Sequence, residues 1–338
     1  MINKVAIVVP CLNEVAYLDR LIESVLSQDL EGISLRLLIV DGMSTDGSRA
    51  LIKKWEIRDA RVTLCDNKAR VTPVALNIGI AQSKSETVII LGAHAEVARD
   101  FTRKNLETLA LHPDAGCVGG SIENIYESNT ARIIGLAVSS PFGVGNARFR
   151  TGGSEGEVDT VAFGAYRNKV FEKIGLFDQR LVRNQDDEFN YRLLKSGYKI
   201  WFNPEIRSRY YVRGTFDKLA RQYRQYGYWK VYVNRLHSTI TTVRQLVPFF
   251  FVSSMLALLL LSLVFPFSLF FFAIGASLWS VAAAYFAHRK KEKKGDFLAI
   301  MRCFFILHFY YGWGFGQGIV AFIVLRKTPD VQNPNLTR

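Results

Sequence analysis

Three consecutive acids, Asp186, Asp187 and Glu188, are the residues whose types and spacing point most directly to chemistry. A carboxylate in such a group is suited to accept a proton from a substrate hydroxyl as a general base. Arg183 and Arg192 flank the triplet and would offset part of its charge. The structural alternative is a solvated helix N-terminus, where acids are favoured by the positive end of the helix dipole. The rest of the chain decides between the two interpretations.

Four further polar clusters each follow a short apolar run. They are Pro10–Glu14, Asp41–Asp46, Lys68–Arg70 and Gly92–Glu96. Each has a plain alternative, since Asn13 could cap a helix and Asp41 could form a turn. Their shared position after successive apolar runs is the stronger observation, because α/β proteins bind ligands at the carboxyl ends of parallel strands.

The elements that would position these clusters alternate between strand and helix. Continuous apolar, β-branched runs predict strands that are buried on both faces. These runs are Lys4–Pro10, Leu35–Val40, Val62–Asp66 and Thr87–Leu91. Helices are expected between them, at Glu14–Ser27, near Arg49–Trp55 and at Pro73–Ala81. The alternation predicts an α/β fold with a parallel sheet.

The C-terminal part of the chain has a different composition. The 338 residues are 49% hydrophobic, and the excess over an ordinary soluble enzyme begins at Leu246. Residues 246–264 and 267–287 each have about the twenty apolar residues that a bilayer requires, so we expect a membrane hairpin. Residues 297–325 form a third apolar segment that either spans or is re-entrant. The basic run His288–Lys294 should stay in the cytoplasm.

The net charge of +13 is concentrated before the hairpin. The sequence between Arg207 and Arg244 contains many cations and aromatic residues but a single acid, Asp217. This pattern predicts an interfacial helix near 207–244 that contacts membrane lipid and phosphate, with no nucleic acid as partner. The scattered Cys11, Cys65, Cys117 and Cys303 indicate a reducing compartment, without disulfides or zinc. No signal peptide is recognised, which favours a cytoplasmic N-terminal domain.

Together these motifs resemble glycosyltransferase family 2, which has the GT-A fold. The resemblance rests on V-P-C-L-N-E from Val9, D-G-M-S-T-D-G-S from Asp41, the A-H-A around His94, and N-Q-D-D-E-F-N-Y-R from Asn184. Residues 158–197 are most similar to the succinoglycan-biosynthesis glucosyltransferase branch, which carries a C-terminal membrane anchor. The resemblance implies a GT-A domain over residues 1–235, followed by transmembrane helices.

The resemblance also implies where the donor binds. Pro10, Asn13 and Glu14 would line the nucleotide pocket, Asp41 would bond the base, and Lys68 and Arg70 would reach the base or diphosphate. A carboxylate only accepts hydrogen bonds, which suits a uracil N–H and hence a UDP-sugar.

After the fourth strand the sequence departs from the family pattern. Relatives carry Asp-x-Asp there, which binds ribose and a divalent metal, whereas this chain has Gly92 at the first position and His94 at the second. His94 and Glu96 would hold Mn²⁺ or, more weakly, Mg²⁺. The alternative is that His94 bonds a phosphate directly and no metal is tightly held.

On the acceptor side, the family pattern falls on the acidic triplet. Asp186 would be the general base, and Asp187, Glu188 and Arg192 would support it. A single displacement by the acceptor hydroxyl inverts the anomeric centre. Processive synthases carry Gln-x-x-Arg-Trp near here, and neither Gln222 nor Gln225 starts that motif, so we expect a non-processive hexosyltransferase.

The expected acceptor is a polyprenyl-diphosphate-linked saccharide in exopolysaccharide or related glycan biosynthesis. Arg221 and Arg224 would contact its phosphates, at the cytoplasmic face of an inner membrane that holds a multi-pass anchor. Two alternatives stay open: a polyprenyl-phosphate sugar synthase, and a catalytically weakened sugar-nucleotide-binding assembly subunit. Gly92 is the reason for the second.

Overall fold

The computed structural model describes residues 3–212 and 214–329. By its internal contacts the chain divides into two compact units. Within the described residues, the first unit comprises 3–125 and 147–211, and the second comprises 126–146 and 212–329. The predicted glycosyltransferase domain ends near residue 235, whereas residues 126–146 and 214–235 have their contacts in the second unit.

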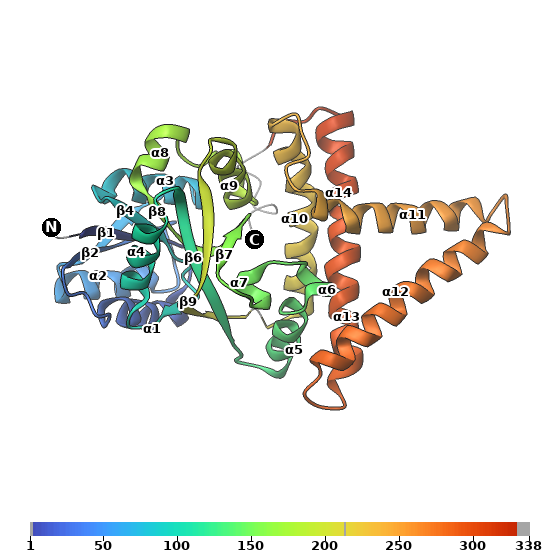
Figure 1. The fold of residues 1–338 in the computed structure, drawn as a ribbon, viewed down its shortest axis with the longest axis horizontal. Helices are drawn as coiled ribbons and strands as arrows, with labels where there is room; N and C mark the ends of the chain where they lie inside the picture. The colour runs from blue at the N-terminus through green and yellow to red at the C-terminus, as the bar shows by residue number, and fades with distance from the viewer. Residues whose placement is uncertain (1–2, 213, 330–338) are drawn as a thin grey trace. The chain divides into compact units, whose positions relative to one another are not determined.

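A mixed nine-stranded sheet forms the centre of the first unit (Figure 1). Its order is β3-β2-β1-β4-β8-β6-β9-β5, with β7 beside β9. Strands β1 to β4 are parallel, and β8 is antiparallel to both of its neighbours. The strands are β1 (Asn3–Cys11), β2 (Ile33–Asp41), β3 (Val62–Asp66), β4 (Thr87–Ile90), β5 (Ala95–Val97), β6 (Ala115–Ile125), β7 (Gly156–Val158), β8 (Ala162–Arg167) and β9 (Lys199–Tyr211).

Helices cover both faces of this sheet. They are α1 (Val15–Leu26), α2 (Ser48–Arg58), α3 (Thr72–Ser83), α4 (Phe101–Leu111), α7 (Arg148–Thr151), α8 (Asn168–Ile174) and α9 (Gln185–Lys195). On one face, Val5 and Ile7 of β1 belong to the same core as Leu18 of α1. On the other face, Ala6 and Val8 share a core with α3, α8 and α9. Side chains on successive strand positions alternate between the two faces of the sheet. The continuous apolar run of β1 is therefore buried on both faces, as predicted.

The helix predicted near 207–244 is shorter than expected. Residues 207–211 complete β9, where the buried Ile206 and Ser208 alternate with the exposed Arg207 and Arg209. This period of two is the strand pattern, and the basic composition of the segment concealed it. The helix α10 begins only at Phe216, after Thr215 accepts a hydrogen bond from the Lys218 backbone N–H, and ends at Leu236.

The second unit is helical. Its elements are α5 (Asn129–Val138), α6 (Pro141–Val144), α10 (Phe216–Leu236), the 3-10 turn η1 (Val243–Leu246), α11 (Val247–Leu261), α12 (Ser268–Lys290), α13 (Asp296–Phe305), the π turn η2 (Ile306–Tyr310), α14 (Tyr311–Gly318) and the π turn η3 (Ile319–Val324). Within the described part of the chain, three segments are long and apolar enough to cross a membrane: Val243–Leu261, Ser268–Lys290 and Asp296–Val324.

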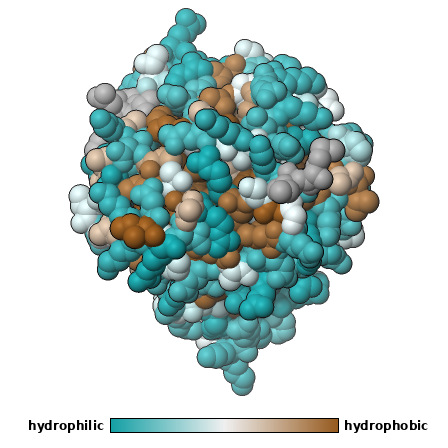
Figure 2. Space-filling model, turned by 90° about the vertical axis from the view of Figure 1, so that its left-hand side faces the viewer, coloured by the Kyte–Doolittle hydropathy of each residue, from teal (hydrophilic) through white to brown (hydrophobic). Residues whose placement is uncertain are grey.

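The surfaces of the chain differ in polarity. The face turned to the viewer in Figure 2 is mostly hydrophilic. In α11 and α12, by contrast, large apolar side chains such as Leu260 and Phe270 are exposed to 57% and 56%. Exposed apolar surface of this extent on helices of spanning length is typical of contact with lipid.

Glycines in the third segment allow close helix packing in the second unit. A Cβ atom at Gly314 would lie 2.0 Å from the Arg224 carbonyl oxygen of α10, and one at Gly318 would lie 2.6 Å from the Tyr228 carbonyl oxygen. The spacing is the small-xxx-small pattern of close helix crossings. These glycines therefore hold the third segment against α10.

Candidate active site

The loop after β2 holds a buried carboxylate in a defined position. Asp41 has no exposed surface, and its Oδ2 accepts hydrogen bonds from the Ser44 backbone N–H (2.9 Å) and from Arg49 Nη1 (2.9 Å). The Ser44 hydroxyl donates to the other oxygen, Oδ1. Arg49 also bonds Asp66 at the end of β3 (2.8 Å), and these hydrogen bonds raise the pKa of its guanidinium. A carboxylate has about four acceptor positions, and Asp41 uses three of them within the protein.

The loop after β1 is tied to the same turn. The Asn13 backbone N–H donates to Ser44 Oγ (2.7 Å), and Asn13 Oδ1 accepts from the Thr45 N–H (2.9 Å). Asn13 adopts a φ of +55°, which asparagine tolerates better than most residues. Pro10 lies opposite Val40 in the β1–β2 pair. The structure therefore brings Pro10, Asn13 and Asp41 together at one edge of the sheet.

His94 pairs with Glu14 from the first loop. Their atoms Nε2 and Oε1 are 3.0 Å apart, and both side chains are partly exposed. Glu96, the other predicted metal ligand, accepts a hydrogen bond from the Tyr211 hydroxyl instead. The Tyr17 ring packs against both the His94 ring and the Tyr211 ring, with distances between ring centres of 4.5 Å and 5.0 Å. The structure thus joins His94 to Glu14 and Glu96 to Tyr211, not the two predicted ligands to each other.

At Gly92 an aromatic ring lies close to the position where a side chain would begin. A Cβ atom there would lie 3.2 Å from Phe163 Cε1, which is closer than ordinary contact. Phe163 itself has a φ of +50°, a strained conformation for an aromatic residue. An aspartate at position 92 would therefore require the Phe163 ring to move.

These contacts test whether a metal ion fits. Among residues 3–212 and 214–329, no three His, Cys, Asp or Glu side chains lie close enough to hold one. The nearest arrangement is the pair of one imidazole and one carboxylate at His94 and Glu14. Mn²⁺ and Mg²⁺ favour sites rich in oxygen ligands. The side chains present do not fit a metal ion held by the protein alone.

Lys68 and Arg70 lie in the loop between β3 and α3, and both side chains are exposed. Arg70 has a φ of +60°. This loop follows Asp66, the partner of Arg49, so it lies at the same edge as Asp41. Both cations are accessible to an anionic ligand.

The acidic triplet occupies the first turn of α9, and its members have different surroundings. Asp186 is exposed, and its Oδ1 accepts a hydrogen bond from the Asp187 backbone N–H (2.9 Å). Glu188 is 1% exposed and forms a two-point ion pair with Arg192 (2.7 and 2.9 Å). Arg192 also donates to the carbonyl oxygens of Ile174 and Leu176. Glu188 and Arg192 thus anchor the helix, while Asp186 faces solvent.

In the second unit, Arg221 and Arg224 lie one turn apart on α10. Both side chains are exposed, and Arg224 Nε donates to Gln317 Oε1 of α14 (2.7 Å). The Arg224 guanidinium keeps further N–H groups for a phosphate.

Sequence reasoning missed three residues that shape the edge of the sheet. They are Arg49, Tyr17 and Phe163. The contact between Arg49 and Asp41 could have been predicted from the sequence. Arg49 lies eight residues after Asp41, at the start of the next helix, and a side chain there can reach the end of the preceding strand. Nothing in the sequence indicated that Phe163 would contact Gly92.

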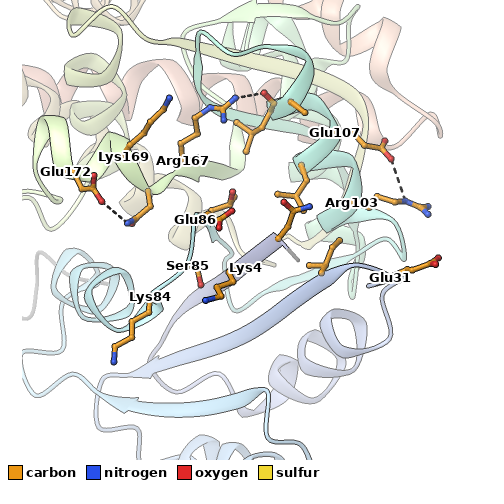
Figure 3. A pocket seen from close by; sticks show the side chains of 17 residues that line it. Lys4, Glu31, Lys84, Ser85, Glu86, Arg103, Glu107, Arg167, Lys169 and Glu172 are labelled. Atoms are coloured by element: carbon orange, nitrogen blue, oxygen red, sulfur yellow. Dashed lines mark hydrogen bonds and ion pairs between the residues drawn. The ribbon is translucent and has the colours of Figure 1, made fainter. Parts of the chain in front are cut away.

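A separate depression of about 870 Å³ lies at the opposite end of the parallel strands (Figure 3). Its lining includes Lys4, Lys84 and Glu86. Several of its charged groups are already bonded within the protein: Arg103 approaches Glu107 (3.9 Å), and Arg167 donates to the Ala115 carbonyl (2.9 Å). Ligands of open α/β sheets bind at the carboxyl ends, so this depression is not the candidate site.

Comparisons with known proteins identify the family and the fold. The family described as Glycosyl transferase family 2 matches residues 6–175. A Methanococcus voltae protein, named as dolichyl N-acetyl-alpha-D-glucosaminyl phosphate 3-beta-D-2,3-diacetamido-2,3-dideoxy-beta-D-glucuronosyltransferase, is 30% identical over 94% of this chain and 98% of its own length. Succinoglycan biosynthesis protein ExoA of Rhizobium meliloti (strain 1021) is 31% identical over 72% of this chain and 73% of its own length.

Solved structures share the fold at lower identity. The mannosyltransferase PcManGT from Pyrobaculum calidifontis, in complex with GDP-Man and Mn²⁺, aligns with a TM-score of 0.51 and 15% identity over 96% of this chain and 75% of its own. S. aureus TarS in complex with UDP aligns with a TM-score of 0.50 and 15% identity over 65% of this chain and 63% of its own. The fold is GT-A, as predicted, and the protein is a glycosyltransferase that belongs to glycosyl transferase family 2.

Proposed function

We propose that this protein is an inverting, non-processive hexosyltransferase that uses a UDP-sugar and acts on a polyprenyl-diphosphate-linked saccharide. The observation that carries the proposal is the contrast within the acidic triplet. Glu188 is neutralised by Arg192, whereas Asp186 is an exposed carboxylate at the start of α9. The positive end of the helix dipole stabilises that carboxylate in its ionised form, as a proton acceptor requires.

In this mechanism Asp186 takes the proton of the acceptor hydroxyl. The hydroxyl oxygen then forms a bond to the anomeric carbon as the bond from that carbon to the diphosphate breaks. An α-linked donor gives a β-linked product and a free nucleoside diphosphate. Asp187 and the ion pair of Glu188 with Arg192 keep the base in position.

The nucleotide would bind at the edge built by the first two loops. Pro10, Asn13 and Glu14 would line the base and ribose, and Asp41 would take the uracil N–H. Lys68 and Arg70 would lie beside the base or diphosphate. Gly92 and His94 would face the ribose and phosphates.

We place the anchor in the inner membrane as a multi-pass segment, with the first unit in the cytoplasm. The basic run after α12 supports this orientation by the positive-inside rule. Arg221 and Arg224 of α10 would contact the phosphates of the lipid-linked acceptor. The name of the Methanococcus voltae relative specifies a dolichyl-linked sugar phosphate, which supports a polyprenyl-linked saccharide as the acceptor but does not bear on the diphosphate.

Transfer of radiolabel from UDP- and GDP-sugars to membrane lipids tests the proposal, with Asp186→Asn as the main variant. We expect this variant to bind UDP with unchanged affinity and to lose transfer, whereas Asp114→Asn, on an exposed acid paired with Lys199, should match the wild type. Near-normal turnover of Asp186→Asn would refute the base assignment. A labelled sugar joined directly to the phosphate of a polyprenyl monophosphate would indicate a polyprenyl-phosphate sugar synthase, and sugar-nucleotide binding without any transfer would indicate an assembly subunit.

A further inference from the structure

Arg150 lies beside the candidate donor site on a short helical turn. Its guanidinium carbon is 5.9 Å from the centre of the Tyr210 ring, and the Tyr210 and His94 ring centres are 6.4 Å apart. Tyr210 pairs with Ala95, the residue after His94, in the β5–β9 ladder. Arg150 is therefore one aromatic ring away from His94, at the edge where β4 ends.

The backbone of Arg150 is held in place, while its side chain has no acidic partner among the residues that the structure describes. Its N–H donates to the Ala147 carbonyl oxygen (2.8 Å), and the turn closes at Gly152, whose φ is +78°. Across the described parts of the chain, no hydrogen bond or ion pair joins the Arg150 side chain to a carboxylate. Its neighbour Arg148 instead donates to the Ser154 carbonyl oxygen (3.3 Å). Arg150 is a positioned, partly buried cation with bonding capacity left over.

The leaving group of the proposed reaction requires positive charge at this edge. A nucleoside diphosphate gains negative charge as the sugar departs, and fixed cations or metal ions usually stabilise that charge. The side chains do not provide a site for a metal ion, because the Phe163 ring contacts Gly92 and Glu96 bonds Tyr211. Arg150 and His94 can bond phosphate oxygens here, in addition to the exposed Lys68 and Arg70 of the loop after β3.

We infer that Arg150, together with His94, binds the diphosphate of the nucleotide-sugar donor in place of a metal ion held by an acidic cluster. The inference rests on the proposed function, because it assumes a nucleotide-sugar donor. Arginine suits the role, since its planar guanidinium can bond two phosphate oxygens at once and is always charged. The Tyr210 ring supports the guanidinium from one side.

Equilibrium binding to the full-length protein in detergent tests the inference. Affinities for UDP and uridine are measured in EDTA and then with Mn²⁺, and the difference between the two ligands isolates the diphosphate. GDP and guanosine are measured in parallel. We expect the wild type to prefer the diphosphate in EDTA. Arg150→Gln should weaken binding of the diphosphate roughly 10- to 100-fold and leave the nucleoside affinity unchanged.

Two further variants sharpen the result. Arg209→Gln removes the same charge from the residue next to Tyr210, but Arg209 pairs with the exposed Glu123 (3.1 Å), so this variant should bind UDP like the wild type. Arg150→Lys keeps the positive charge but lacks the planar guanidinium that can bond two phosphate oxygens. This variant should retain part of the preference for UDP over uridine. Unchanged uridine binding shows that each variant is folded.

The outcomes separate the inference from the proposed function. A diphosphate preference that survives in Arg150→Gln, or that appears only with Mn²⁺, would overturn the inference and leave the glycosyltransferase proposal intact. A wild-type protein that binds none of the four ligands would refute the proposed donor class itself, and the inference with it.

Discussion

Removal of the Glu188 carboxylate should destabilise the protein far more than removal of a surface acid. Glu188 is 1% exposed, and Arg192 bonds both of its oxygens. The same guanidinium donates to two carbonyl oxygens in the segment after α8. Glu188→Ala would leave Arg192 in this partly buried position without its counter-charge.

The structure sets the size of the effect. Breaking a buried ion pair from one side costs about 3–5 kcal/mol. The Arg192 side chain is 22% exposed, so water can reach part of it, and we expect the lower end of that range. For a unit of this size, about 3 kcal/mol corresponds to a fall of roughly 6–12 °C in the unfolding midpoint.

Thermal unfolding of the full-length protein in detergent measures the change, and the chain offers a matched control. Glu123 and Arg209 form the same kind of pair (3.1 Å), but their side chains are 70% and 58% exposed. Glu123→Ala should cost about 0–1 kcal/mol. A combined Glu188→Ala and Arg192→Met variant should lose less stability than the sum of the two single variants, because neither charge is then left unpaired.

The reasoning fails if Glu188→Ala unfolds within a few degrees of Glu123→Ala, because the ion pair would then contribute little to stability. It also fails if Asp186→Asn shows a fall as large as that of Glu188→Ala. Asp186 is exposed, and surface substitutions usually change stability by no more than about 0.5 kcal/mol.

Two further predictions concern packing and thiol chemistry. Gly314→Leu should lower the unfolding midpoint and weaken retention in the membrane fraction, because a Cβ atom there would lie 2.0 Å from the Arg224 carbonyl oxygen. Gly316→Ala should have little effect, because its Cβ atom would have its nearest neighbour at 3.8 Å, and equal behaviour of the two variants would contradict the proposed helix crossing. Burial raises the pKa of the Cys11, Cys65 and Cys117 thiols, so at pH 7.5 they stay protonated and should resist iodoacetamide in the native protein. Mass spectrometry should find them modified only after denaturation, and rapid native labelling of Cys65 would contradict the burial.

The parallel half of the sheet was predictable because its strands are buried on both faces. Their apolar runs are continuous, and the strand predicted at Val62–Asp66 coincides with β3. The antiparallel half was harder to predict. Strand β9 carries arginines on its exposed positions, and its alternation became visible only beside its partners β6 and β5. The basic composition of residues 207–211 indicated an interfacial helix. In the structure these residues form a strand, because they pair with β6 and β5, which are distant in the sequence.

The individual residues of the site were predictable where the chain is local. Asn13 follows β1 and Asp41 ends β2, and hydrogen bonds tie the loops after these two strands together. Arg49, which bonds Asp41 from the start of α2, was not predicted. The metal ligands were less predictable, since the spacing of His94 and Glu96 says nothing of Glu14 or Tyr211. Those partners come from the loop after β1 and from β9, and only the folded chain brings them to the two side chains.

Gly92 shows how one missing side chain changes the chemistry expected of a site. In the sequence it reads as the loss of an acid, which favours a weakened enzyme. In the structure the Phe163 ring contacts it, and the strained backbone of Phe163 is the kind of feature that is retained at functional sites. The Phe163 ring packs near the Tyr210 ring, and beside Tyr210 lies Arg150, which has no acidic partner within residues 3–212 and 214–329. A diphosphate site in which Arg150 and His94 replace a metal ion held by acids accounts for these features together. A loss of catalytic function explains only the glycine.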